Sequence, residues 1–128
     1  QNKYLYWKGY IFTEISEELM MNLYKQNIIL MQFMNNYKKL TDEYQKYVIL
    51  IDIDKKSVKE QIKIHSKLPY IKTYDFKYNV LIANKIGRNK IANLETMKKQ
   101  LINVDRTKQN TLYLIEDIID NNMYKIVI

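Results

Sequence analysis

Hydrophobic and polar positions in the first third of the chain follow two different periods. The segment "KYLYWKGYIF" (residues 3–12) alternates Tyr, Trp and Ile with polar residues around Gly9, which predicts a short strand pair or a strand and a turn. From Thr13, a residue type that caps helix N-termini, apolar residues recur at intervals of three or four positions as far as Met34. This spacing predicts one long N-terminal amphipathic helix.

The rest of the chain predicts strands that alternate with helices. "YVILID" (residues 47–52) is a continuous apolar run of strand length, typical of a strand buried on both faces of a parallel sheet. "SVKE" (residues 57–60) is a capping box, which predicts a helix that continues until Pro69. The later segments predict two strands, two helices and a final strand, in "YIKTYDF" (70–76), "NVLIA" (79–83), the stretch from Gly87 to about Leu101, "TLYLIEDIID" (111–120) and "MYKIVI" (123–128). We therefore predict an α/β fold with a parallel β-sheet and βαβ units, in a single domain of residues 1–128.

Composition narrows the function classes. The absence of cysteine excludes a disulfide framework, a thiolate nucleophile and a cysteine-ligated metal. No apolar run approaches the roughly 18 residues that a membrane helix needs, so no membrane partner is predicted. The net charge of +7 comes mostly from dispersed lysines, and the abundance of Lys, Asn, Ile and Tyr with little Gly or Pro is the pattern that an AT-rich genome imposes. The charge alone therefore does not indicate nucleic-acid binding, and we predict no nucleic-acid partner.

Few side chains offer catalytic chemistry. His65 is the only histidine, and it lies in a predicted helix with no carboxylate or nucleophile close by in the sequence, so we interpret it as structural. Asp52 and Asp54 resemble a metal-binding carboxylate pair at a strand end, but two lysines follow at once. Gly9 and Gly87 are too far apart in the sequence to form a glycine-rich phosphate loop. These observations predict no catalytic constellation, no cofactor and no metal.

Three segments of the chain are informative when taken in order: "LYWKGYIFTEISEELMMNLYKQNIILMQFM", "YVILIDIDKKSVKEQIKIHSKLPYIK" and "DRTKQNTLYLIEDIIDNNMYKIVI". Together they resemble the ClpP family of serine peptidases, which form barrel-shaped proteolytic chambers. In the second segment, Ser57, Val58 and residues 70–72 keep the residue types of the family in register. The resemblance implies the ClpP/crotonase-type α/β fold, with a long helix near the N-terminus.

The same resemblance implies that the catalytic machinery is lost. Lys55 and Lys56 fall on the glycines that help to form the oxyanion hole of the family, and Gly87 falls on the nucleophilic serine. Asp105 matches the acid of the triad, but no histidine follows residue 65. The resemblance therefore predicts a pseudo-peptidase of the ClpR type. The family's handle region is short or missing here: either it is deleted, or the sequence has a seam within residues 88–101.

For such a subunit the resemblance implies a homo-oligomeric ring, typically heptameric, with a scaffolding or regulatory role in an ATP-dependent Clp protease. It also implies an active ClpP paralogue and an AAA+ Clp chaperone as partners. Together with the AT-rich composition, it suggests the plastid-derived organelle of an apicomplexan parasite, with the targeting segment not present in this chain.

Two other functions stay open from the residues themselves. A basic α/β module could bind nucleic acid through lysines around Lys55, Lys56, Lys85 and Lys90. A metal-dependent enzyme would use Asp52 and Asp54.

Overall fold

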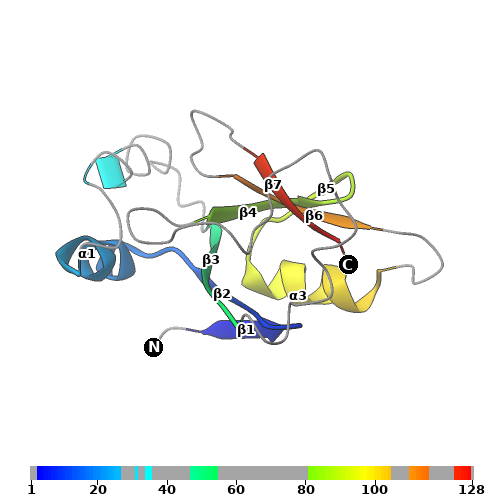
Figure 1. The fold of residues 1–128 in the computed structure, drawn as a ribbon, viewed down its shortest axis with the longest axis horizontal. Coiled ribbons are helices and arrows are strands. Elements are labelled where there is room, and N and C mark those ends of the chain that lie inside the picture. The colour runs from blue at the N-terminus through cyan, green and yellow to red at the C-terminus, as the bar shows by residue number, and fades with distance from the viewer. Residues whose placement is uncertain are drawn as a thin grey trace.

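An antiparallel sheet forms the centre of the protein. The computed structural model describes residues 3–26, 31, 34–35, 47–54, 81–104, 110–115 and 123–127 (Figure 1). Within this part of the chain the sheet has seven strands: β1 (Tyr4–Trp7), β2 (Tyr10–Glu14), β3 (Val48–Ile53), β4 (Leu81–Ile86), β5 (Asn89–Lys90), β6 (Thr111–Ile115) and β7 (Met123–Val127). The strand order is β1-β2-β3-β4-β6-β7, and β5 pairs with β4. Every pairing is antiparallel.

The prediction of a ClpP/crotonase-type α/β fold with a parallel sheet and βαβ units is therefore wrong. The apolar run in β3 was assigned to a parallel sheet because it is buried on both faces. In the structure the two faces of β3 contribute to two separate apolar clusters: Val48 and Leu50 belong to one, and Ile49 belongs to the other. Burial on both faces thus results from helices on either side of an antiparallel sheet.

The first helix is short. α1 (Glu17–Lys25) begins after Ser16, whose side-chain oxygen accepts a hydrogen bond from the Leu19 backbone N–H at 3.1 Å, and Gln26 is its C-cap. The prediction of one long helix from Thr13 to Met34 is wrong, because Thr13 is a buried residue of β2 that pairs with Ile49. No helix in the described part of the chain is long and apolar enough to cross a membrane.

The second described helix, α3 (Leu94–Ile102), begins with a capping box. The Asn93 side chain accepts a hydrogen bond from the Thr96 backbone N–H at 2.8 Å, and the Asn93 N–H donates to Thr96 Oγ1 at 3.0 Å. The Leu94 N–H donates to the Glu14 carboxylate at 3.0 Å, which places a negative charge at the positive end of the helix and ties it to β2. Met97, fully buried, attaches the inner side of α3 to the core.

Predictions for the other segments had mixed outcomes. The strand pair in residues 3–12 and the final strand are confirmed, and the 111–115 part of the predicted last helix is strand β6. The predicted helix that begins at residue 57 and the predicted strand 70–76 lie outside the described residues.

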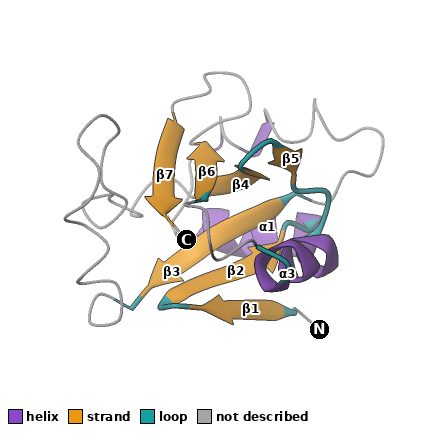
Figure 2. Cartoon of the chain, turned by 90° about the vertical axis from the view of Figure 1, so that its right-hand side faces the viewer, coloured by secondary structure: helices purple, strands orange, loops and turns teal. Residues whose placement is uncertain are grey.

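The sheet is strongly twisted, so that β1–β3 and β4, β6 and β7 run in different directions (Figure 2). β3 and β4 pair over three positions only, from Val48 opposite Ala83 to Leu50 opposite Leu81. β5 pairs with the remaining length of β4, through Lys85 and Ile86. α3 lies in the angle between the two groups of strands and covers the larger apolar cluster. The members of this cluster are Tyr10, Phe12, Val48, Leu50, Leu81, Ala83, Ile86, Leu94, Met97, Leu112, Leu114 and Ile126.

The smaller cluster lies on the opposite face of the sheet. It joins Met20 and Leu23 of α1 to Ile49, Ile82 and Ile115, which lie on three adjacent strands. We call the face of the sheet that α3 covers the α3 face, and the opposite face, against which α1 packs, the α1 face.

Candidate nucleic-acid interface

An irregularity in β4 changes which of its side chains face the core. Ala83 pairs with Leu114 and Lys85 pairs with Tyr113, so Asn84 is an extra residue with no partner on β6. In regular alternation Lys85 would follow Ala83 onto the α3 face and into the core. The bulge instead sends Lys85 to the α1 face and allows Ile86 to be buried on the α3 face.

The chain reverses directly after this bulge. Gly87 and Arg88 form the two-residue turn between β4 and β5, with Ile86 opposite Asn89. Gly87 has φ +59°, a positive value that is usual for glycine at the first central position of a type II′ turn. Its N–H donates to the Thr111 carbonyl at 2.8 Å, which holds the turn against β6. Gly87 thus lies in a hairpin turn, and the helix that was predicted to begin there begins at Leu94.

Four side chains line up across the four strands β5, β4, β6 and β7. Lys90 is opposite Lys85, Lys85 is opposite Tyr113, and Tyr113 is opposite Lys125. Residues directly opposite one another in antiparallel strands point to the same face of the sheet. We call these four residues, Lys90, Lys85, Tyr113 and Lys125, the basic row. It lies on the α1 face, beyond the end of the smaller apolar cluster.

The middle of the basic row is held by a cation–π contact. The Lys85 Nζ lies 4.9 Å from the centre of the Tyr113 ring, within the range over which the ring attracts a cation. Lys85, Tyr113 and Lys125 are half-buried, whereas Lys90 and the adjacent turn residue Arg88 are exposed. The row therefore presents positive charge on both sides of an aromatic ring.

No carboxylate of the described residues forms an ion pair with this row. Lys99 and Glu95 form an ion pair at 3.9 Å, but both lie on α3, outside the row. Like charges directly opposite each other in a sheet are destabilising, so placing Lys85 beside Lys90 costs free energy in the isolated protein. An anion bound across the two lysines would remove that cost.

The other predicted site residues are not gathered at this place. Lys55, Lys56, His65 and Asp105 lie outside the described residues. Asp52 is exposed at the end of β3, and one of its carboxylate oxygens accepts a hydrogen bond from the Ile53 N–H at 2.8 Å. Across the described ranges, no group of three or more acidic or histidine side chains is arranged to hold a metal ion.

Sequence reasoning named Lys85 and Lys90 but missed the two residues that complete the row. Tyr113 lies in the predicted helix 111–120, and Lys125 lies in the predicted final strand, whose neighbours in the sheet were not predicted. The alternation in "TLYLI" was the signal for Tyr113, because Leu112 and Leu114 are buried on one face and Tyr113 must then face the other.

Comparisons with protein-family models, with curated proteins and with solved structures found no match for this chain.

Proposed function

We propose that the protein binds single-stranded nucleic acid along the basic row. The observation that carries the proposal is the alignment of three lysines and one tyrosine across four adjacent strands. Neighbouring strands lie about 4.8 Å apart, so the row is about 14 Å long. At the stacked spacing of about 3.4 Å per nucleotide, that length follows roughly four nucleotides.

The residue types favour a single strand over a duplex. Proteins that bind unpaired strands combine cations, which contact the phosphates, with an aromatic ring on which a base stacks. In the basic row Tyr113 is the ring, and lysines lie on both sides of it. A base that stacks on Tyr113 would displace the Lys85 ammonium from the ring towards the adjacent phosphate, where the charge is better compensated.

The role of an inactive, ring-forming ClpR-type subunit stays a prediction. Its structural premise was a parallel sheet, which the antiparallel pairings overturn, so we do not base the proposal on it. The expected oligomeric ring, the Clp partners and the organellar location likewise stay predictions.

Fluorescence anisotropy with labelled DNA and RNA strands of about 12 nucleotides tests the proposal. Each phosphate contact to a single strand contributes about −0.7 to the slope of log K against log salt, so the three lysines of the row and Arg88 give a slope of about −3. The double variant Lys85→Ala with Lys90→Ala should reduce the magnitude of the slope by about 1.4 and weaken binding.

A matched control variant distinguishes an effect of the basic row on binding from an effect of the protein's net charge. Lys25 on α1 and Lys98 on α3 are exposed lysines outside the basic row, and replacing both by alanine removes the same net charge. This control should bind as the parent does. Binding that is absent, that does not depend on salt, or that falls equally in both double variants would contradict the proposal.

A further inference from the structure

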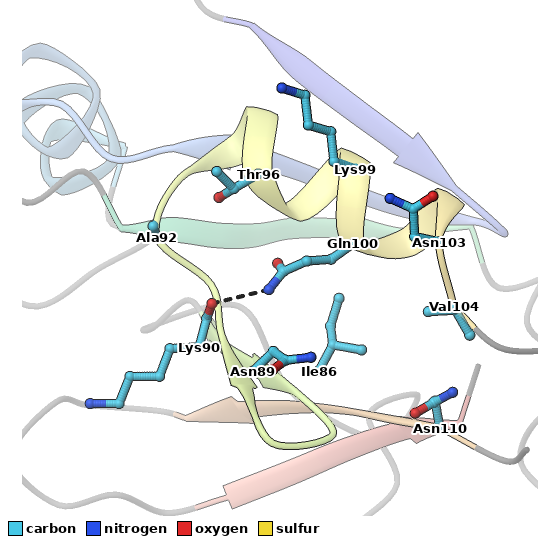
Figure 3. Close-up of a pocket in the computed structure, with 10 residues that line it drawn as sticks. All are labelled: Ile86, Asn89, Lys90, Ala92, Thr96, Lys99, Gln100, Asn103, Val104 and Asn110. Carbon is cyan, nitrogen blue, oxygen red and sulfur yellow. Dashed lines mark hydrogen bonds between the residues drawn. The ribbon is translucent and has the colours of Figure 1, made fainter.

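A cavity lies on the other side of the hairpin that carries the basic row. It has a volume of about 630 Å³ and is bounded by the β4–β5 hairpin and α3 (Figure 3). Ile86 and Asn89 are opposite each other in the hairpin and both line the cavity. Lys85 is not among the lining residues, and Lys90, which pairs with it, borders the cavity. Figure 3 shows the Lys90 side chain directed away from the cavity. One hairpin thus contributes to two surfaces with different chemistry.

Carboxamides dominate the polar lining of the cavity. Asn89 comes from β5 and Gln100 from α3, whose C-cap is Asn103, and Asn110 directly precedes β6. The described lining contains lysine but no carboxylate, so the cavity is suited to a neutral or anionic ligand and not to a cation. A carboxamide presents a donor and an acceptor side by side, which matches the alternating donors and acceptors on the edge of a nucleobase. The apolar side chains of Ile86 and Val104 provide contact for a flat ring.

The Gln100 side chain has unused hydrogen-bonding capacity. Its Nε2 donates to the Lys90 carbonyl oxygen at 3.1 Å, and since that oxygen can only accept, the orientation of the amide is fixed. Its Oε1 is buried and has no hydrogen-bond partner among the described residues. Buried acceptors are nearly always paired in proteins. Gln100 also lines the cavity, so an unpaired buried acceptor lies at its border.

We propose that this cavity accepts one nucleobase, recognised at its edge by the carboxamides. The inference rests on the proposed function, because the base would belong to the strand that the basic row holds. Among the described strands β5 pairs with β4 alone, so the other edge of β5 is open. A nucleotide can pass round that open edge from the basic row to the cavity. The volume of the cavity lies within the range of about 300–1,000 Å³ that small-molecule sites occupy.

Base selectivity tests the cavity, since stacking on Tyr113 is tolerant of sequence whereas hydrogen bonding at the base edge is not. The probes are oligo-dA, oligo-dC and oligo-dT of equal length at one salt concentration. The parent protein should prefer one of them about tenfold. The variant Asn89→Ala with Asn103→Ala should bind the three about equally with an unchanged salt slope, while Asn22→Ala, an exposed carboxamide on α1, keeps the preference.

The two proposals fail in different ways. Salt-dependent binding with equal affinity for the three probes, or a preference that survives in the Asn89→Ala, Asn103→Ala variant, would overturn the nucleobase cavity and leave the proposed function standing. If no strand binds, the proposed function fails. In that case saturable binding of a free nucleoside monophosphate, lost in the double variant, would still support the cavity, and its absence would overturn the cavity as well.

Discussion

Replacing Lys90 by glutamate should stabilise the free protein and weaken its binding to nucleic acid. Lys90 lies directly opposite Lys85, so Lys90→Glu turns a repulsive pair into an attractive one across the hairpin. Cross-strand charge pairs are worth roughly 0.2–1 kcal/mol, and the exposure of Lys90 puts the expected gain at about 0.5–1 kcal/mol. For a chain of 128 residues this gain raises Tm by about 2–4 °C.

The same substitution changes the charge of the basic row by two units. It removes one phosphate contact, so at about 0.7 log units per contact for each tenfold change in salt the magnitude of the slope falls by about 0.7 and the affinity near 0.1 M salt falls about fivefold. Repulsion between the new carboxylate and the phosphates adds to this loss of affinity. Opposite effects on stability and on binding are the distinctive result, because a substitution that merely damages the fold lowers both.

Calorimetry and anisotropy on the same samples measure the two effects. Lys90→Gln removes the repulsion between the two lysines without adding attraction and should give about half of the stabilisation. It loses the same phosphate contact without adding a carboxylate, so its affinity should fall by less than that of Lys90→Glu. Lys98→Glu makes the same change of net charge outside the row and should leave binding close to that of the parent. The stabilisation should also shrink in about 1 M salt, where the screening length is about 3 Å. If the Lys90→Glu protein has a Tm at or below that of the parent and binds nucleic acid equally well, Lys85 and Lys90 do not lie on the same face of the sheet.

Three further predictions concern the framework of the site. Asn93→Ala removes the cap of α3 and should lower the free energy of unfolding by about 1 kcal/mol in urea denaturation, with Asn22→Ala as a neutral comparison. Gly87→Ala should cost about 1 kcal/mol through its positive φ alone, because a methyl group there would lie at an ordinary 3.5 Å from Asn110; a larger loss would mean a steric clash. Burial raises the pKa of Tyr10 to about 12, so the folded state keeps a proton that the unfolded chain releases near pH 10. The stability should therefore fall between about pH 10 and pH 12 in the parent and not in Tyr10→Phe.

Local features of the fold could be predicted where one signal dominated. The β1–β2 hairpin follows from the alternation around Gly9, and in the structure its turn has φ +46° at Lys8 and +89° at Gly9, as a type I′ turn requires. Strand β3 follows from its apolar run. The antiparallel direction of its pairing could not be predicted, because a strand that is apolar on both faces has the same sequence pattern in a parallel and in an antiparallel sheet.

The prediction of a helix over residues 111–120 was wrong because the segment fits both a helical and a strand spacing of apolar residues. In "TLYLIEDIID", Leu112, Ile115 and Ile119 fit a helical spacing, while Leu112 and Leu114 fit a strand. β6 pairs with β4 on one side and β7 on the other, and these long-range contacts decide in favour of the strand. The basic row could not be predicted from the sequence for the same reason, since it exists only once the order β5, β4, β6, β7 is known.

The unpaired Asn84 lets β4 hold one extra residue without exchanging its two faces. Before it, β4 contributes hydrophobic groups to both faces of the sheet; after it, Lys85 meets Tyr113 on the α1 face and Ile86 enters the core on the α3 face. Deleting Asn84 would place Lys85 directly after Ala83 and leave both side chains on the faces they now occupy. Pairing Asn84 with Tyr113 would instead drive the Lys85 ammonium into the core and move Ile86 to the opposite face, so the positive surface and the core of this half of the protein both depend on Asn84 staying out of the ladder.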